Sequence, residues 1–339
     1  MKIQELKEAG KDPIILDAGD LFFSTKKLDA VNRRSEEYRA KSILKGYNKI
    51  GCDAINVGHY EMLNGLKFLR NLTKTTDIPF ISANLRSAKS NELLFQPYHI
   101  IEREKIKFGV IGLTSMLPDT CKSIVADDYI TVGNQYIDEL SKNTDIIIML
   151  VNAERSAQSD LVANFPNADF IITSGSNNMS RHNSPQKTGG PYIYSCGKQG
   201  KYLLVLDADL KNKNEPMVDV SGHQKKIDDI KKRFKRLQKK DPSKSLEDIY
   251  SKQENILKII NQYRTDLKES ELAVANAVNT VQFKTIALNN KIQDDPDILS
   301  FVDLSIKTCN SLNPETLSKS KSEKNKVKAK KTDHSGHKH

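Results

Sequence analysis

With 339 residues and 37% hydrophobic residues, the chain is long enough for one large domain and an appendage, and too apolar to be disordered throughout. Its formal net charge of +10 is concentrated in two segments: residues 223–270 hold 14 Lys and Arg against 8 Asp and Glu, and residues 311–339 hold 8 against 3. This local charge argues against a general nucleic-acid or membrane binder. No stretch reaches the roughly 18 apolar residues that span a bilayer, and residues 1–11 lack the apolar region of a signal peptide.

Residues 1 to about 210 alternate short apolar strands with amphipathic helices, a pattern that favours an α/β layered domain. The strand segments are rich in Ile and Val, which is typical of strands buried on both faces. We expect strands at residues 13–17, 53–57, 79–83, 98–102, 106–112, 145–151, 169–173, 192–196 and 201–209, and helices at residues 2–10, 31–50, 63–73, 133–142 and 155–164.

Residues 223–270 have a different pattern. Apolar residues recur there at three- and four-residue steps in two runs that Asp241 and Pro242 separate. We therefore expect two antiparallel helices joined by a tight turn, with the narrow apolar seam of a coiled coil. The charges of this hairpin are interpreted as a solvated face, and a role in dimerisation or docking on an acidic partner is the alternative.

The last segments predict a strand, a helix and a tail. Residues 278–292 alternate like a strand, and the Asp-Asp-Pro sequence at 294–296 begins a helix that runs to about Cys309. Residues 311–339 are rich in Lys, Ser and Asn and contain three His. We expect a disordered tail with no dedicated metal site.

These patterns together predict four parts. They are a layered domain over residues 1–222, a basic helical hairpin over residues 223–270, a strand and helix that pack back on the domain over residues 271–310, and a disordered basic tail over residues 311–339.

Polar residues follow two of the expected strands. Residues 15–22 read Ile-Leu-Asp-Ala-Gly-Asp-Leu-Phe, and the segment after the next strand contains Gly58-His59-Tyr60-Glu61. Because ligands of α/β proteins bind outside the carboxyl ends of the strands, these residues are candidates for a metal or phosphate site.

Both blocks resemble signatures of the calcineurin-like metallophosphoesterases, in their 5'-nucleotidase branch, where the second block reads Gly-Asn-His-Glu. The segments 82–84, 108–114 and 197–203 resemble later parts of the family in order and spacing. This resemblance covers residues 1–210 and implies a layered fold of two facing mixed β-sheets flanked by helices. The family's opening Asp-x-His strand has no counterpart, so the first strand of the fold is expected to be missing.

The resemblance implies a pair of divalent metal ions, such as Zn, Mn, Ca or Mg, which clamp a phosphate group and activate water. Carried over by position, Asp20 falls at the carboxylate that bridges the metals, and His59 falls at an Asn ligand. Tyr60 stands in place of the catalytic His. The alternative to these metal-binding and catalytic roles is a structural one. Asp20 would then end a strand, His59 would be a hydrogen-bonded loop histidine, and Tyr60 would fill the space that the catalytic His occupies in the family.

Other family positions are also substituted. By position, Asn152 replaces a metal-binding His, and Gly175 and Asn177 replace the two His of the last block. Asn84 and Gly197 are the expected substrate-binding positions. Asn152 and Asn177 are weak amide ligands, which suit hard ions better than zinc.

One carboxylate and one imidazole do not hold two metal ions, so we favour an impaired or inactive homologue, a pseudoenzyme that serves as a binding or assembly module. Its partners would be a small phosphorylated ligand and a protein, or a second copy, bound through residues 223–270. The alternative is an active metal-dependent phosphoesterase of nucleotide catabolism that hydrolyses nucleotides or other phosphate monoesters. A third hypothesis is a nucleic-acid or acidic-surface binder through the hairpin and tail, although no aromatic stacking motif favours nucleic acid.

The expected location depends on the start of the chain. The family resemblance implies a periplasmic or extracellular protein, whereas the lack of a signal peptide implies a cytoplasmic one if the start is genuine. A truncated N-terminus would explain both the missing strand and the missing signal.

Overall fold

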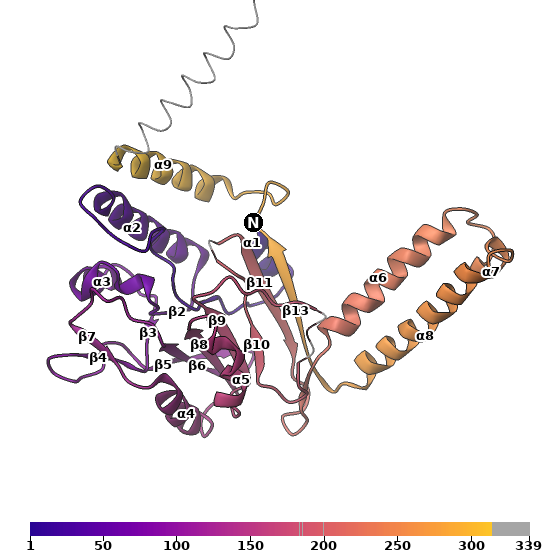
Figure 1. The fold of residues 1–339 in the computed structure, drawn as a ribbon, viewed down its shortest axis with the longest axis horizontal. Coiled ribbons are helices and arrows are strands. Elements are labelled where there is room, and N and C mark those ends of the chain that lie inside the picture. Colours follow the sequence, from indigo (N-terminus) through magenta and orange to yellow (C-terminus); the bar gives the residue numbers. More distant parts are fainter. Residues whose placement is uncertain (183, 185, 199, 314–339) are drawn as a thin grey trace, which may run out of the picture. The chain divides into compact units, whose positions relative to one another are not determined.

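The computed structural model describes residues 1–182, 184, 186–198 and 200–313. The chain forms two compact units. Figure 1 labels their helices and strands in chain order. The first unit holds Met1–Gln158, Thr173–Ser176 and the described residues from Asn289 on, and the second holds Ser159–Ile172 and Asn177–Leu288. The tail predicted at residues 311–339 lies outside the described residues from 314 on. Among the described helices, none is long and apolar enough to cross a membrane.

A short parallel sheet lies in the first unit. Its strands follow the order β1 (Leu16–Asp17), β2 (Ala54–Asn56) and β3 (Phe80–Ile81). The helices α2 (Arg33–Ile50) and α3 (Gly65–Thr73) connect these strands and bury their apolar faces. The resulting core is formed by buried side chains that include Phe22, Leu44, Ile55, Met62 and Leu69.

A longer sheet in the same unit supplies the second set of strand ends. Strand β6 (Ile106–Thr114) pairs in parallel with β8 (Ile146–Asn152) and in antiparallel with β5 (Tyr98–Arg103). Thr114 lies opposite Asn152 in this register, so two polar residues end neighbouring strands. Four further elements belong to this unit: the helices α1 (Lys2–Glu8) and α4 (Tyr129–Leu140), and the antiparallel strands β4 (Leu85–Ser87) and β7 (Ile124–Ala126).

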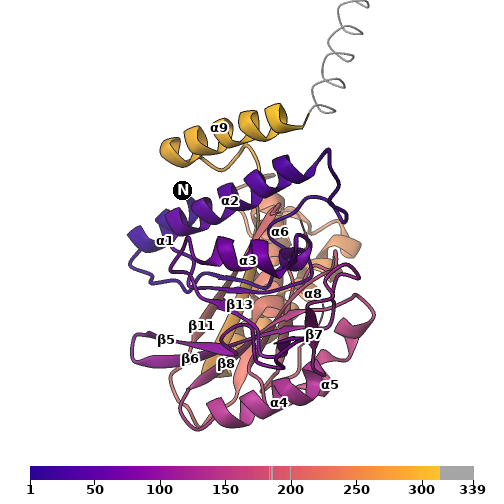
Figure 2. The same cartoon turned by 90° about the vertical axis from the view of Figure 1, so that its left-hand side faces the viewer.

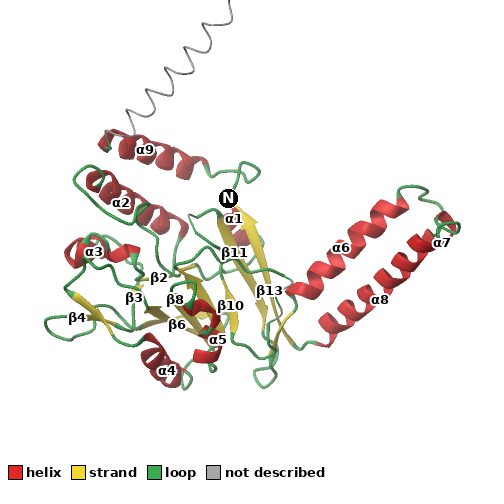
Figure 3. Cartoon of the chain, viewed as in Figure 1, coloured by secondary structure: helices red, strands yellow, loops and turns green. Residues whose placement is uncertain are grey.

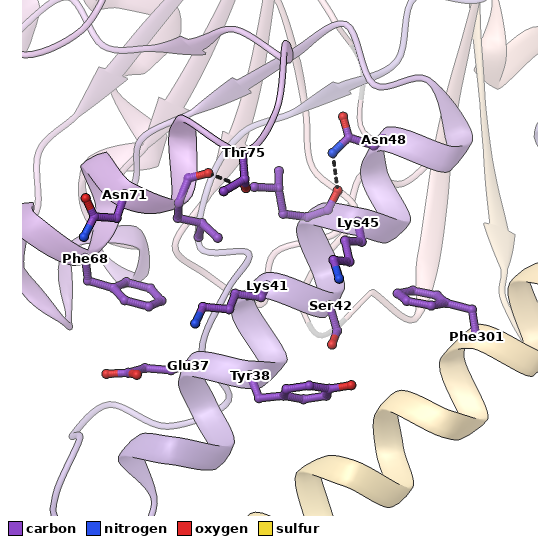
Figure 4. A pocket seen from close by; sticks show the side chains of 12 residues that line it. Glu37, Tyr38, Lys41, Ser42, Lys45, Asn48, Phe68, Asn71, Thr75 and Phe301 are labelled. Atoms are coloured by element: carbon purple, nitrogen blue, oxygen red, sulfur yellow. Dashed lines mark hydrogen bonds between the residues drawn. The ribbon is translucent and has the colours of Figure 1, made fainter.

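The last described helix packs on α2. Helix α9 (Pro296–Leu312) begins at Asp295, whose side chain accepts hydrogen bonds from the backbone N–H groups of the first turn. The Ser35 hydroxyl donates to the Cys309 carbonyl at 2.9 Å, and Figures 1 and 2 show α9 alongside α2. A cavity of about 570 Å³ lies between α2, α3 and α9, with Lys41, Phe68 and Phe301 among its lining residues (Figure 4). None of the candidate site residues lines it.

The second unit contains a pair of parallel strands, a three-stranded sheet and a helical hairpin. Strand β9 (Phe170–Ser174), whose first three residues belong to this unit, pairs in parallel with β10 (Tyr192–Tyr194). The three-stranded sheet has the order β11 (Tyr202–Asp209), β13 (Asn279–Ala287) and β12 (Met217–Asp219), with β13 antiparallel to β11 and parallel to β12. Figure 3 shows these strands in yellow.

The hairpin lies between β12 and β13 in the chain. It consists of α6 (Ser221–Gln238), α7 (Leu246–Ile249) and α8 (Glu254–Asn276), and α6 lies beside α8 (Figure 3). Leu246, Tyr250 and Ile260 form a small buried cluster against which Phe234 and Leu237 pack. The prediction of two helices joined by a tight turn is therefore only partly right, because the Ser245 side chain caps a separate short helix, α7.

Other differences from the predicted elements are local. The helix predicted at 155–164 is reduced to a 3-10 turn at Ala157–Ser159 and the four-residue α5 (Leu161–Asn164). The Gln158 side chain is turned inward there and donates to the carbonyls of Ala153 and Ser174, each at 2.9 Å. Helix α4 begins earlier than predicted because Asp128 caps the Thr131 N–H. The three-residue strands β4, β7 and β12 are too short to show a period in the sequence.

Candidate functional site

The loops after β1 and β2 touch each other through two glycines. A Cβ atom on Gly19, which has a φ of 97°, would lie 2.9 Å from the backbone nitrogen of Gly58. A Cβ atom on Gly58 would in turn lie 2.9 Å from the backbone nitrogen of Asp20 and from Cγ of Asn152. This close backbone approach requires glycine at both positions and brings the two sequence blocks together.

Glu61 holds the loop that carries Asp20. Its carboxyl group is fully buried and accepts three backbone N–H groups, those of Asp20 at 2.9 Å, Leu21 at 2.6 Å and Gly58 at 2.9 Å. Burial raises the pKa of the Glu61 carboxyl above its ordinary value, and the charge of Asp20 adds to the rise. Asp20 itself has a φ of 67°, a left-handed conformation that is costly for a non-glycine residue and is maintained here by these hydrogen bonds.

Asp20, His59 and Tyr60 lie close together in the loops after β1 and β2. The Tyr60 backbone N–H donates to Oδ1 of Asp20 at 3.0 Å, and the rings of His59 and Tyr60 lie 5.5 Å apart. Burial, and then the charge of Asp20, raise the pKa of the Tyr60 phenol above its ordinary value. The phenol therefore stays protonated near neutral pH and is a poor group for exchanging protons there.

Asn152 is tied into a chain of hydrogen bonds that crosses the candidate site. Its Oδ1 accepts from the His59 backbone N–H at 3.1 Å and from the Thr114 hydroxyl at 3.2 Å. Its Nδ2 donates to the Ser174 hydroxyl at 2.7 Å, and that hydroxyl donates to the Ala18 carbonyl at 2.7 Å. Asn152 has no exposed surface. Its amide links the C-terminal ends of β2, β6 and β9 directly, and that of β1 through Ser174.

The backbone at Gly175 leaves no room for a side chain. Gly175 has a φ of 87°, and a Cβ atom there would lie 2.6 Å from the Ala153 carbonyl oxygen and 2.6 Å from Cε of Met116. The Met116 methyl group can move, but the Ala153 carbonyl belongs to the backbone. An imidazole therefore does not fit at this position without a shift of the loop.

The remaining candidate residues occupy different environments. Asn84 is fully buried; it donates to the carbonyls of Thr114 and Asp127 at 2.8 and 3.0 Å and accepts the Thr114 N–H at 3.1 Å. Asn177 is exposed on the loop that follows β9, and Gly197, with a φ of 77°, lies in the second unit with it. The first unit thus brings together Asp20, His59, Tyr60 and Asn152, with Asn84 joined to them through Thr114.

Sequence reasoning missed two participants and the structural role of a third. Thr114 and Ser174 supply hydroxyl groups to Asn152, and Glu61, a member of the second sequence block, supports the Asp20 loop. Their signal was present in the sequence, because Thr114 and Ser174 are the polar residues that end apolar strands, like Asp20 and Asn152.

The described donors do not fit a pair of divalent metal ions. A two-metal site needs several carboxylate, imidazole or amide oxygen ligands around ions about 4 Å apart. Among the residues that the structure describes, no three His, Cys, Asp or Glu side chains are grouped so that they could hold a metal ion. Asp20 and His59 offer one carboxylate and one imidazole, and the Asn152 amide is already engaged on both its atoms.

The fold defines the class of protein. Bacillus subtilis YfkN, a calcineurin-like phosphoesterase, superposes over 91% of this chain and 87% of its own, with a TM-score of 0.59 and 16% identity. A putative 5'-nucleotidase from Staphylococcus aureus superposes over 90% of this chain and 52% of its own, with a TM-score of 0.57 and 13% identity. The chain therefore has the layered α/β fold of the calcineurin-like phosphoesterases, as the motifs predicted.

The sequence relatives define the branch. The protein UshA of Salmonella pullorum is 27% identical over 254 residues, which is 64% of this chain and 44% of that protein. A 5'-nucleotidase of Vibrio parahaemolyticus is 26% identical over 251 residues, 63% of this chain and 43% of that protein. No family model matches the chain. These relatives and the fold together support the metallophosphoesterase superfamily, 5'-nucleotidase branch, for this chain, whose match spans less than half the length of the curated relatives.

Proposed function

We propose that this chain is a 5'-nucleotidase-like protein with an impaired catalytic site, which acts as a module for binding and assembly. The observation that carries this proposal is the series of hydrogen bonds in which both atoms of the Asn152 amide are engaged. The family resemblance implies a metal-binding imidazole at this position, yet the amide here joins the His59 backbone to Ser174 and, through Ser174, to Ala18. Because its oxygen and nitrogen both make hydrogen bonds within the protein, the Asn152 side chain has a structural role and not that of a metal ligand.

Two further features support the impairment. The position that the family resemblance assigns to another His is Gly175, where a Cβ atom would meet the Ala153 carbonyl oxygen. The position of the catalytic His is Tyr60, whose raised pKa keeps the phenol protonated. Metal binding and proton transfer would therefore both lack the groups that the family uses.

The binding role follows from the same residues. Asp20, His59 and Tyr60 are each partly exposed, so the site keeps polar groups at the surface of the first unit. The proposed ligand is a small phosphorylated compound, by analogy with the relatives named as 5'-nucleotidases. Assembly through the hairpin belongs to the same proposal and rests on the charged helices of residues 223–270. The periplasmic or extracellular location rests on the family resemblance.

An active phosphoesterase is the second candidate, because the hydrogen bonds that position the Asp20 loop are present. Glu61 holds Asp20 in its left-handed conformation through three backbone N–H groups, and Asp20 presents its carboxylate beside His59 and Tyr60. In this candidate, Asp20 and His59 would help to bind a metal ion, and the substrate would be a nucleotide or another phosphate monoester.

Turnover separates the two candidates. We expect the full chain to release no phosphate above the buffer rate from adenosine 5'-monophosphate or phenyl phosphate in excess manganese, zinc, calcium or magnesium. We also expect Asp20→Asn to leave this result unchanged, since no catalytic metal depends on that carboxylate. Phosphate release by the wild-type chain that disappears in a folded Asp20→Asn variant would establish the active phosphoesterase instead.

A further inference from the structure

Helix α6 carries a row of cations on one face. Lys232, Lys235, Arg236 and Lys239 are all exposed, and together with Asp229 and Arg233 they line a surface hollow of about 600 Å³. With 3.6 residues per turn, these four positions fall within about a quarter to a third of the helix circumference. We call these four residues the α6 stripe.

The other cations of α6 are already engaged within the hairpin. Lys225 pairs with Asp229 at 2.7 Å, Lys226 with Asp266 at 3.2 Å and Lys231 with Glu271 at 2.9 Å. The two remaining cations lie on aromatic rings, Arg233 over Tyr263 and Lys240 over Tyr250.

The α6 stripe differs from these neighbours. No described ion pair or ring contact involves any of its four members within the described part of the chain. Hairpin carboxylates thus neutralise α6 selectively and leave one continuous row of positive charge. Asp228 and Asp229 limit this row at its N-terminal end, one turn before Lys232.

We propose that the α6 stripe binds the phosphodiester backbone of double-stranded nucleic acid without sequence preference. The stripe is about 10 Å long, from a helical rise of 1.5 Å per residue. One strand of a duplex presents a phosphate about every 3.4 Å along its axis, so the stripe faces about three phosphates. Four exposed cations in a row match such a charge pattern.

The surroundings of the stripe favour a polyphosphate backbone over a membrane or a protein. No large apolar side chain of α6 is exposed, because Ile227, Ile230, Phe234 and Leu237 lie at buried or partly buried positions. A helix that enters a membrane surface needs an exposed apolar face, and a protein interface needs an apolar or aromatic anchor. Backbone phosphate contacts need neither, since cations supply most of their affinity.

The absence of a stacking motif bears on single strands only. Proteins that bind single strands stack the bases on aromatic rings, whereas the bases of a duplex are stacked on each other. Two tyrosine rings of the hairpin, Tyr250 and Tyr263, are covered by Lys240 and Arg233. The hairpin therefore fits a duplex backbone.

A matched pair of variants tests this proposal. The probe is a fluorescein-labelled 30-base-pair DNA duplex, and its anisotropy is measured with the full chain at several salt concentrations. We expect a Kd of about 10 μM or tighter at 50 mM salt. Replacing the four stripe residues with Gln should weaken binding at least about tenfold and reduce the slope of log K against log salt by about 3, since the stripe faces about three phosphates.

The control removes the same charge elsewhere in the hairpin. Replacing Lys225, Lys226, Lys231 and Lys258 with Gln removes four cations that are paired with carboxylates, and we expect the affinity to change less than about threefold. Circular dichroism verifies the helices of both variants. An equal loss in both variants, full binding by the stripe variant, or no duplex binding by the wild-type chain would each overturn the proposal. Stripe-dependent binding to phosphatidylserine vesicles or to polyglutamate, with no binding to the duplex, would overturn it as well.

Discussion

Replacing Glu61 with Ala should lower the free energy of unfolding by about 3 to 5 kcal/mol, the largest effect that we expect from a single side chain of the site. Glu61 is fully buried and accepts the N–H groups of Asp20, Leu21 and Gly58. Each buried N–H group that loses its acceptor costs about 1 to 3 kcal/mol, and Asp20 would also lose the hydrogen bonds that maintain its left-handed backbone.

Urea unfolding, followed by circular dichroism, measures this loss. Glu61→Gln should be milder, because its amide oxygen can still accept two of the three N–H groups. Tyr60→Phe is the matched control from the same loop, since no described hydrogen bond uses the Tyr60 hydroxyl, and we expect a change within about 0.5 kcal/mol. If Glu61→Ala were as mild as Tyr60→Phe, the loop that carries Asp20 would not depend on Glu61.

The second large effect is expected at Gly175. Gly175→Ala should lower the free energy of unfolding by about 2 to 5 kcal/mol, of which about 1 to 2 kcal/mol comes from the left-handed backbone and the rest from the clash with the Ala153 carbonyl. A Cβ atom at this position would lie only 2.6 Å from that oxygen. Gly175→His, which introduces the imidazole that the family resemblance implies, should be at least as destabilising.

Alanine substitutions at two other glycines separate the backbone cost of Gly175→Ala from the cost of its clash with Ala153. Gly65 has a φ of 78° but open space around it, so Gly65→Ala should show the backbone cost alone, about 1 to 2 kcal/mol. Gly46 lies inside α2 in open space, and Gly46→Ala should stabilise the chain by about 0.5 to 1 kcal/mol. If Gly175→Ala cost no more than Gly65→Ala, the loop after β9 could adapt to a side chain, and the impairment at this position would have to be reconsidered.

Part of the fold was predictable because its signals are local. Runs of Ile and Val mark the strands β6 and β8, and the glycine and carboxylate blocks around Asp20 and Glu61 mark the family. The strands β4, β7 and β12 were missed because three residues are too few to show a period. The short helix α7 was missed because the break between α7 and α8, at residues 250–253, lies inside an otherwise continuous apolar pattern.

The chemistry of the site was less predictable, because it depends on contacts between distant residues. The sequence shows that Asn152 replaces a family imidazole, but not that its amide is held by Ser174 and Thr114. Ser174 in turn donates to Ala18, which lies 156 positions away in the chain. The obstruction at Gly175 likewise depends on the carbonyl of Ala153, from the segment that follows β8. Such contacts follow from the tertiary fold and leave no spacing rule in the sequence.

The metal content of the chain is the most direct test of an impaired catalytic site. The full chain would be equilibrated with excess manganese and zinc, dialysed against metal-free buffer and measured by elemental analysis, with Asp20→Asn treated in parallel. We expect less than one tightly bound ion per chain, and no difference between wild type and Asp20→Asn, because Asp20 and His59 do not complete a ligand set. Two tightly bound ions per wild-type chain, lost in Asp20→Asn, would contradict this expectation and show that the phosphoesterase site still assembles.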